Sequence, residues 1–308
     1  MITKIEGLIA APFAPMLPDG TVNLDLIPDY YSFLQKNGVV GAFINGSTGE
    51  GVSLSQKEKQ QITEAWTRQN KQHKALKVIN LVGGTSYQEC IESAQASEEA
   101  GVDAIAILAP FYFKPTTGGQ LAEFCAQISE AVPNLPVYFY HIPVLTGCQV
   151  SMFDFIQAAD GMIPNLAGIK YTHEDFMDFL TCLNFKDGKY DMLWGRDENL
   201  LSALVLGARG GVGSTFNYAA PLYHELIRAY DEGNLLEARK LQQQSIDMIR
   251  LLGKYGGIAT GKAYMRYVGL DCGAFRLPVK NMTNEAYQQF ETDVRALEME
   301  PFFSKIQD

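Results

Sequence analysis

Eight short apolar runs, each followed by a longer amphipathic segment, fill this chain from residue 7 to residue 232. Several of the runs are apolar without alternation, as in Ala104–Leu108, which is typical of parallel strands covered on both faces. The expected strands are Gly7–Phe13, Gly41–Asn45, Lys77–Val82, Ala104–Leu108, Pro136–Tyr140, Leu166–Tyr171, Asp191–Trp194 and Gly211–Ser214. Eight evenly spaced strand–helix units predict an α/β fold, a (β/α)8 TIM barrel of the usual size of about 250 residues, in preference to a doubly wound open sheet.

The amphipathic segments between these runs carry the sequence signals of helix ends. Ser55 is followed three residues later by Glu58, a capping box that predicts the start of a helix. Gly101 directly follows another amphipathic segment, and a glycine at this position is typical of a helix end. The expected barrel helices are Leu24–Asn37, Ser55–Asn70, Ser86–Ala100, Gly119–Val132, Ser151–Asp160, His173–Phe185, Glu198–Ala208 and Pro221–Glu232.

After Gly233 the pattern changes, because three amphipathic segments follow one another with no apolar run between them. They predict helices over Leu235–Lys254, Gly261–Gly269 and Asn284–Leu297. We therefore expect residues 1–233 to form the barrel that carries the active site. Residues 234–308 should form a C-terminal helical extension that packs on the barrel within the same domain.

The charge of the chain excludes several classes of partner. The 308 residues include 25 Lys and Arg against 35 Asp and Glu, and the formal net charge is −10 at pH 7. An acidic chain without a basic cluster argues against nucleic acid and against anionic membrane surfaces.

No apolar run approaches the roughly 20 residues that span a bilayer, and the first residues lack the apolar core of a signal peptide. The five cysteines are odd in number and widely spaced, which predicts reduced packing residues in a cytoplasmic protein.

Two patterns that could suggest a cofactor or a metal are discounted. Residues 256–263 nearly match a phosphate-binding P-loop, but Ala263 stands where the magnesium-binding Ser or Thr belongs, and no strand precedes the glycines. The four histidines lack the spacing of metal ligands, so no metal site is expected. His141 follows Tyr140 on one expected strand and should point to the opposite face, in a structural role.

In a (β/α)8 barrel the active site lies at the carboxyl ends of the strands. The segments expected there are residues 45–51, 109–112, 138–143, 170–172, 195–198 and 213–215. Among them, Lys170 ends a short apolar run that would carry it into an enclosed site. Desolvation lowers the pKa of a lysine and leaves a neutral amine that can attack a ketone. The alternative, and the commoner role for a lysine at a strand end, is an ordinary surface charge.

Three further strand ends carry polar side chains that can bind or move protons. Ser47 and Thr48 lie between glycines, where hydroxyls and backbone amides can form a nest for a carboxylate; an ordinary glycine-rich turn is the alternative. Tyr140 could carry a proton beside Lys170, or be a core aromatic residue. Asp197 and Glu198 could accept hydrogen bonds from a polyhydroxyl substrate, or only complement the dipole of the helix they open.

With these residues placed, the chain resembles the dihydrodipicolinate synthase/N-acetylneuraminate lyase family of class I pyruvate aldolases. The resemblance runs from about residue 5 to about residue 300 and rests on four motifs in the family's order, at about its spacing. These motifs are Gly46–Glu50, Tyr140–Pro143, Gly168–Lys170 and Gly213–Thr215.

The closer similarity is to the lyase branch of this family. Leu145 stands where the synthases normally have an arginine that binds the second substrate's carboxylate, and leucine cannot do that. Residues 194–198 and 213–217 follow the lyase pattern, although Phe216 occupies a position where tyrosine is frequent.

The resemblance implies a Schiff-base aldolase that reversibly cleaves N-acetylneuraminate (sialic acid) to N-acetylmannosamine and pyruvate. It implies that Lys170 forms the covalent imine, that Tyr140 is the acid or base at the C4 hydroxyl, and that no metal or other cofactor is needed. The implied catalytic residues are Lys170, Tyr140, Thr48 and Tyr112. The implied substrate-binding residues are Ser47 and Thr48 for the carboxylate, and Thr172, Gly195, Asp197, Glu198 and Ser214 for the sugar end.

Tyr112 resembles a residue that family members reach across a subunit contact to complete a hydroxyl relay. The resemblance therefore implies a homo-oligomer, at least a dimer and usually a tetramer. Two alternatives remain: a related pyruvate-dependent aldolase or synthase acting on a shorter 2-keto-3-deoxy sugar acid, and a catalytically silent barrel that only binds a ligand. Asp197 and Glu198 favour a long polyol over the shorter substrate.

Overall fold

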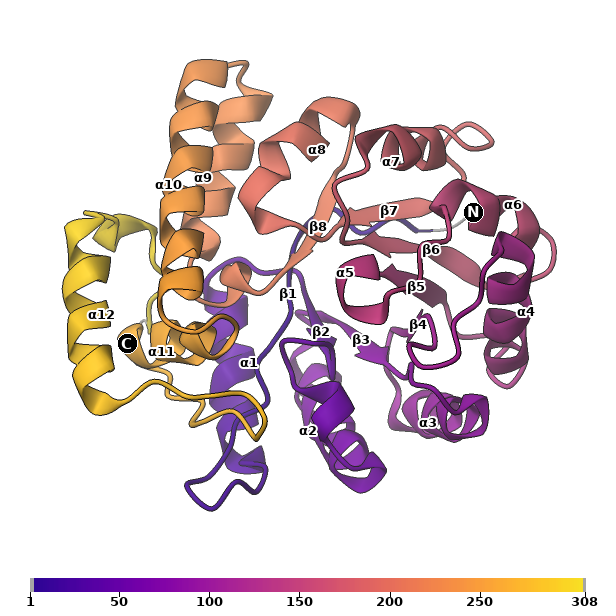
Figure 1. Ribbon diagram of the computed structural model, residues 1–308, viewed down its shortest axis with the longest axis horizontal. Coiled ribbons are helices and arrows are strands. Elements are labelled where there is room, and N and C mark those ends of the chain that lie inside the picture. Colours follow the sequence, from indigo (N-terminus) through magenta and orange to yellow (C-terminus); the bar gives the residue numbers. More distant parts are fainter. Residues whose placement is uncertain (1–2, 307–308) are drawn as a thin grey trace.

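The structure, a computed structural model, describes residues 3–306 and contains a closed barrel of eight parallel strands surrounded by helices (Figure 1). Each strand pairs with its sequence neighbours, and β8 pairs with β1 to close the barrel. The strands are β1 Gly7–Ala10, β2 Gly41–Ile44, β3 Lys77–Leu81, β4 Ala104–Leu108, β5 Val137–His141, β6 Leu166–Tyr171, β7 Asp191–Trp194 and β8 Gly210–Gly213. The predicted (β/α)8 barrel is therefore confirmed, and the doubly wound open sheet is wrong.

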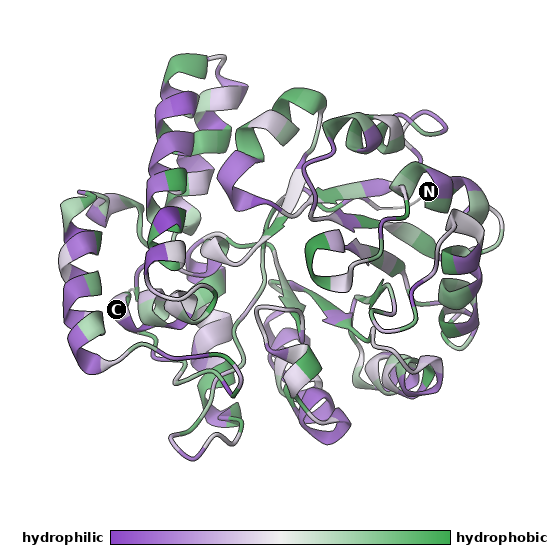
Figure 2. Cartoon of the chain, viewed as in Figure 1, coloured by the Kyte–Doolittle hydropathy of each residue, from purple (hydrophilic) through white to green (hydrophobic). Residues whose placement is uncertain are grey.

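The strands are buried on both faces, as their continuous apolar runs predict. Inward side chains such as Ile9, Phe43 and Tyr140 form one apolar cluster inside the barrel. Outward side chains such as Ile107 and Phe139 belong to a second, larger cluster that packs against the helices. Figure 2 shows the strands mainly in hydrophobic colours and hydrophilic residues mainly on the helices around them. The parity along each strand therefore decides which side chains face the interior.

The helices surround the barrel close to their predicted positions. They are α1 Ile27–Lys36, α2 Gln56–His73, α3 Tyr87–Ala100, α4 Gly118–Ser129, α6 Met152–Ala159, α7 Phe176–Leu183, α8 Leu200–Leu206 and α9 Ala220–Asp231. The capping box at Ser55 and Glu58 is present, and Gly101 ends α3 with a φ of 83°. A short helix, α5 Pro143–Thr146, was not predicted from the sequence.

Helix α7 begins three residues later than predicted because Asp175 caps it. The Asp175 carboxylate accepts a hydrogen bond of 3.0 Å from Asp178 N, which satisfies a free donor of the first turn. Strand β1 is shorter than predicted, and Pro12, which lacks an N–H, lies just beyond it.

In the described part of the chain three α-helices follow the barrel: α10 Leu235–Lys254, α11 Ala259–Tyr267 and α12 Asn284–Ala296. Helix α10 lies beside α9 (Figure 1), and Gln242 accepts a hydrogen bond from Leu201 N and donates one to the Asp197 carbonyl. Tyr264 on α11 stacks on Tyr218, with ring centroids 4.5 Å apart. The division into residues 1–233 and 234–308 stays a prediction.

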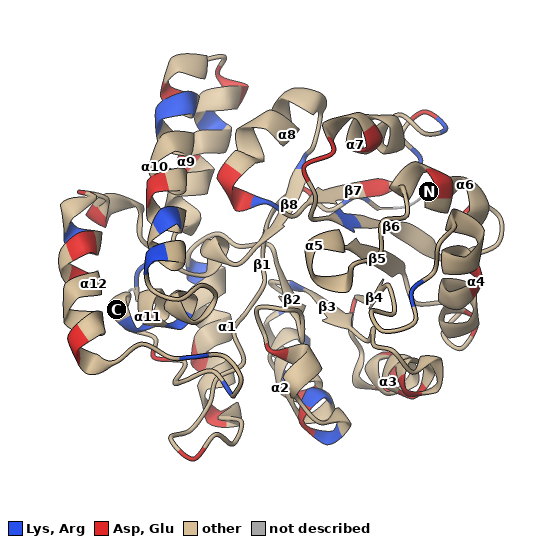
Figure 3. Cartoon of the chain, in the orientation of Figure 1, with Lys and Arg blue, Asp and Glu red and all other residues tan. Residues whose placement is uncertain are grey.

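Charged residues lie mostly on the helices and loops (Figure 3). Within the eight strands of residues 3–306, the Lys, Arg, Asp and Glu residues are Lys77, Lys170 and Asp191. Lys77 and Asp191 each begin a strand, whereas Lys170 lies next to the carboxyl end of β6. Among the helices of residues 3–306, none is both long and apolar enough to cross a bilayer.

Candidate active site

Lys170 is enclosed inside the barrel. Its neighbours Ile169 and Tyr171 belong to the outer apolar cluster, so the alternation of β6 directs Lys170 inward. The residue is 4% exposed, and Nζ lies 4.0 Å from the ring centroids of both Phe43 and Tyr140. The alternative interpretation of Lys170 as a surface charge is therefore wrong.

This environment changes the protonation of the amine. Burial lowers the pKa of Lys170 to about 7, while the negative charge of Asp197 acts in the opposite direction. A lysine with this pKa is neutral in about half of the molecules at neutral pH, against roughly one in three thousand for an ordinary lysine. The arrangement thus supplies an amine that can attack a carbonyl carbon.

Tyr140 lies beside Lys170 on the neighbouring strand, in register with it. Its side chain is inside the barrel, and its ring meets Phe43 edge-on at 5.4 Å. Burial raises the pKa of the Tyr140 phenol to about 12, although the hydroxyls of Ser47 and Thr172 lower it. The phenol is therefore protonated at neutral pH, and it can donate a hydrogen bond to one oxygen while it accepts a hydrogen bond from another group.

The segment after β2 forms a compact turn that carries Ser47 and Thr48. Gly51 N donates to the Gly46 carbonyl at 3.1 Å, and Glu50 N donates to the Ser47 carbonyl at 3.2 Å. Gly51 is required, because a Cβ there would lie 1.9 Å from the Asn45 carbonyl oxygen. Thr48 is buried and Ser47 is half-buried, so this turn is part of the enclosed end of the barrel.

Asp197 is buried and held firmly by the segment that follows β8. Its carboxylate accepts hydrogen bonds from Thr215 N at 2.9 Å and from Thr215 Oγ1 at 2.7 Å. Burial and the neighbouring Glu198 raise the pKa of Asp197 to about 7, whereas the bonds from Thr215 lower it. The Asp197 carboxylate therefore binds Thr215 and does not cap helix α8, which has no side-chain cap.

The remaining residues predicted for the sugar end lie at the carboxyl ends of β6, β7 and β8 but differ in exposure. The Thr172 hydroxyl is buried beside the Tyr140 phenol without a fully formed hydrogen bond among the described residues. Gly195 packs directly on it, since a Cβ there would lie 1.9 Å from Thr172 Oγ1. The Glu198 side chain is one third exposed and lies 3.5 Å from the Arg196 guanidinium. Ser214 is half-buried directly after β8.

Tyr112 is not brought into this cluster. Its side chain is 76% exposed, and its ring meets Phe113, which is 86% exposed. Val144 and Leu145 are also largely exposed. His141 also lies outside the cluster: it packs against Tyr171 and His173, as its position after Tyr140 predicts.

Phe43 and Thr215 were not assigned a role in the site from the sequence. Phe43 covers Lys170 from β2, and alternation along this strand, with Ala42 and Ile44 facing outward, directs its side chain inward. Thr215 belongs to a motif that was recognised, but the sequence does not show that its hydroxyl holds Asp197.

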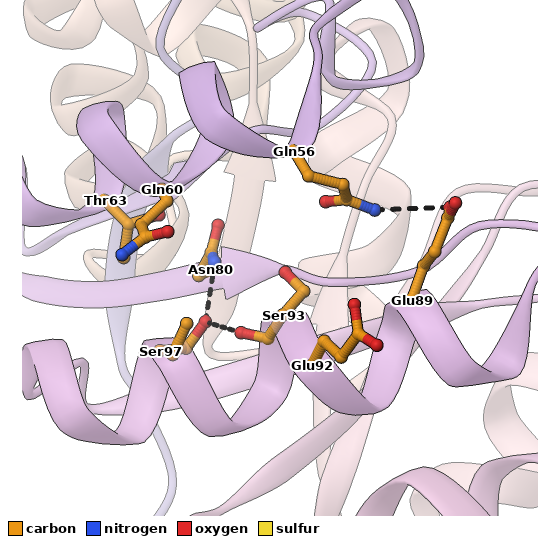
Figure 4. A pocket seen from close by; sticks show the side chains of 9 residues that line it. Gln56, Gln60, Thr63, Asn80, Glu89, Glu92, Ser93 and Ser97 are labelled. Carbon is orange, nitrogen blue, oxygen red and sulfur yellow. Dashed lines mark hydrogen bonds between the residues drawn. The ribbon is translucent and has the colours of Figure 1, made fainter.

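A separate polar pocket of about 140 Å³ lies outside the barrel between α2 and α3 (Figure 4). Asn80 at its base donates to Ser97 at 2.8 Å, and Gln56 donates to Glu89 at 3.4 Å near its rim. Its lining contains amides, hydroxyls and carboxylates but no lysine, so it offers no amine that could form an imine. Within residues 3–306, no group of three or more His, Cys, Asp or Glu side chains could hold a metal ion.

Comparisons with known proteins agree with this arrangement. The sequence signature of the Dihydrodipicolinate synthetase family matches residues 4–297. The chain is 38% identical over 298 residues to the N-acetylneuraminate lyase of Rattus norvegicus, covering 96% of this chain and 93% of the relative. The solved N-acetylneuraminate lyase of Proteus mirabilis has a TM-score of 0.92 at 37% identity, covering 96% and 99% of the two chains. That of Aliivibrio salmonicida, a sialic acid aldolase, has a TM-score of 0.93 at 34% identity, covering 96% and 98%.

Proposed function

The chain belongs to the dihydrodipicolinate synthetase family, and we propose that it is a Schiff-base aldolase that reversibly cleaves N-acetylneuraminate to N-acetylmannosamine and pyruvate. The observation that carries the chemistry is the enclosure of Lys170 between two aromatic rings, which lowers its pKa to about 7. The substrate comes from the names of the relatives, which match along nearly the whole chain.

In the proposed reaction the neutral Lys170 amine attacks the C2 ketone of the open-chain sugar acid. Loss of water from the adduct, with uptake of one proton, gives a protonated imine. The C4 hydroxyl then loses its proton, the C3–C4 bond breaks, and the electron pair moves into the imine to give an enamine of pyruvate and free N-acetylmannosamine. Protonation of C3 and hydrolysis release pyruvate and restore the amine. The iminium supplies the positive charge that stabilises the developing carbanion, so the proposal requires neither a metal nor another cofactor.

Tyr140 is proposed to exchange the proton of the C4 hydroxyl, because its protonated phenol lies against the Lys170 amine. Ser47 and Thr48 are proposed to bind the carboxylate of the substrate, with Thr48 also in the proton relay. This assignment is supported by the compact turn that holds both residues at the enclosed barrel end.

Thr172, Gly195, Asp197, Glu198 and Ser214 are proposed to line the sugar end of the substrate. This assignment is supported by the position of all five residues at the carboxyl ends of β6, β7 and β8. Both oxygens of a carboxylate can accept several hydrogen bonds, so Asp197 can bind a sugar hydroxyl while it keeps its bonds from Thr215. Glu198, which is partly exposed, can move to meet the end of a long polyol.

Tyr112 is proposed to complete the hydroxyl relay of a neighbouring subunit in a homo-oligomer, in our proposal a tetramer. Its support is the exposure of Tyr112 together with the large apolar side chain that it contacts, Phe113. We also propose a cytoplasmic location, supported by five cysteines that are all free. The extension and the barrel are proposed to act as one domain, as the bonds from Gln242 suggest.

The proposal is tested by measuring pyruvate release from N-acetylneuraminate and from 2-keto-3-deoxygluconate, with Lys170→Ala as the matched control. We expect N-acetylneuraminate to be the better substrate and the control to be inactive. A preference for the shorter acid would favour the related aldolase. Full turnover by the control would refute the Schiff-base mechanism, and no turnover with either substrate would favour a ligand-binding barrel.

A further inference from the structure

The turn that carries Ser47 and Thr48 ends at a buried ion pair that reaches into the C-terminal extension. Glu50 closes the turn in a left-handed conformation, with a φ of 57°. Its Oε1 accepts a hydrogen bond of 2.8 Å from Lys262 Nζ on α11. Both side chains are only 3% exposed, although the two residues lie 212 positions apart in the chain.

The segment after α11 holds the same carboxylate from a second side. Glu50 Oε2 accepts a hydrogen bond of 2.8 Å from Arg276 N, and Lys262 Nζ also donates to the Ala274 carbonyl at 2.9 Å. The Arg276 guanidinium donates to the Gly20 carbonyl and forms an ion pair with Glu58 on α2. Both oxygens of Glu50 are therefore used by the extension, and the extension is itself attached to the barrel.

Stability alone gives little reason for this pair. The cost of removing two charges from water offsets most of their attraction, so packed apolar side chains of similar size hold a fold equally well. A carboxylate with two fixed donors does more than apolar contact, because it sets the direction of the backbone that carries it. That backbone is the end of the turn, two residues from Thr48.

We propose that Glu50 and Lys262 are positioning residues, through which the C-terminal extension fixes the turn that binds the carboxylate of the substrate. This inference rests on the proposed function, which gives Ser47 and Thr48 that role. Neither member of the pair is placed at a reacting atom. Their loss should therefore weaken the binding of pyruvate more than it slows the chemistry at Lys170.

The test uses the full chain and pyruvate alone, and it measures how much Lys170 is labelled by borohydride at increasing pyruvate concentration. Borohydride transfers a hydride to the imine carbon and leaves a stable secondary amine, which intact mass and peptide mapping detect. The double variant Glu50→Gln with Lys262→Met removes both charges, so neither is left buried without its partner. Lys254→Met is the control, because it breaks a more exposed ion pair with Asp293 in the same extension.

We expect the half-saturating pyruvate concentration of the double variant to rise roughly tenfold, the effect of losing one charge-assisted hydrogen bond. Labelling at saturating pyruvate should stay complete, and Lys254→Met should match the wild type. A folded double variant with an unchanged half-saturating concentration would overturn the inference. So would a variant that only labels more slowly at saturation.

If circular dichroism shows that the double variant does not fold, Glu50→Asp decides the matter. It keeps the buried charge, but the shorter side chain cannot reach both Lys262 and Arg276. A severalfold rise in half-saturating pyruvate supports the inference, and an unchanged value overturns it. Wild-type protein that pyruvate never labels would instead overturn the proposed function, and this inference with it.

Discussion

Replacing Phe43 by alanine should raise the pKa of Lys170 by about one pH unit. Burial lowers this pKa from its ordinary value of 10.5 to about 7, and two aromatic rings cover Nζ at 4.0 Å each. If each ring supplies half of the desolvation, water in the place of Phe43 raises the pKa of Lys170 by about 1.7 pH units. The lost attraction between cation and ring, about 1 kcal/mol, acts in the opposite direction by about 0.7 unit. Desolvation therefore decides the sign.

Phe43→Leu is the matched control for this argument. Leucine keeps an apolar cover over the amine but removes the aromatic ring, so only the attraction to the ammonium is lost. The pKa of Lys170 should then fall by about 0.7 unit. The two variants are thus expected to move the same pKa in opposite directions.

The assay is the apparent second-order rate at which excess cyanoborohydride traps the pyruvate imine at pyruvate concentrations far below saturation, measured across pH, because this rate reports the free amine. The neutral amine is the reactive form, so the rate should rise with pH and inflect near pH 7 in the wild type. At pH 7 the alanine variant should react about fivefold more slowly, because roughly a tenth rather than half of its amine is neutral. An inflection for Phe43→Ala at or below the wild-type value would refute the claim that burial sets the reactivity of Lys170.

Three further predictions concern the groups around this amine. Thr215→Val removes the 2.7 Å bond to Asp197 and should cost about 1–3 kcal/mol of unfolding free energy in urea, whereas Thr215→Ser should stay near the wild type. Gly195→Ala would place a Cβ 1.9 Å from Thr172 Oγ1, so its melting temperature and its turnover should both fall, and wild-type values for both would contradict the close packing. Because the pKa of Lys170 is depressed, the native state binds fewer protons than the unfolded chain between about pH 7 and pH 10.5, and stability rises with pH across that window. Lys170→Met should accordingly be more stable than the wild type at pH 6, by up to about 5 kcal/mol, and the difference in urea denaturation should shrink towards pH 10.

The barrel and the inward direction of Lys170 could be predicted because both follow from local patterns. Eight apolar runs of strand length specify the barrel, and alternation along β6 places Lys170 on the inner face. Tyr140 follows from the same parity on β5. The pKa of Lys170 could be predicted in direction only, since its size depends on Phe43, which comes from a distant strand.

The contacts that were missed join residues far apart in the chain. Nothing local indicates that Lys262, in a discarded P-loop match, would bond to Glu50, which lies 212 positions earlier in the chain. The start of α7 could not be predicted because several polar residues precede the helix and any of them could cap it. In the structure Asp175 is the capping residue. A role for Tyr112 stays a prediction, because its surroundings in an oligomer lie outside a single chain.

The most direct test of the whole account is a crystal of this protein soaked with pyruvate. The account predicts continuous electron density from Lys170 Nζ to the C2 carbon of pyruvate, with the carboxylate of the adduct against Ser47 and Thr48. Pyruvate bound elsewhere in the barrel, or lying at this end with no bond to Lys170, would contradict it.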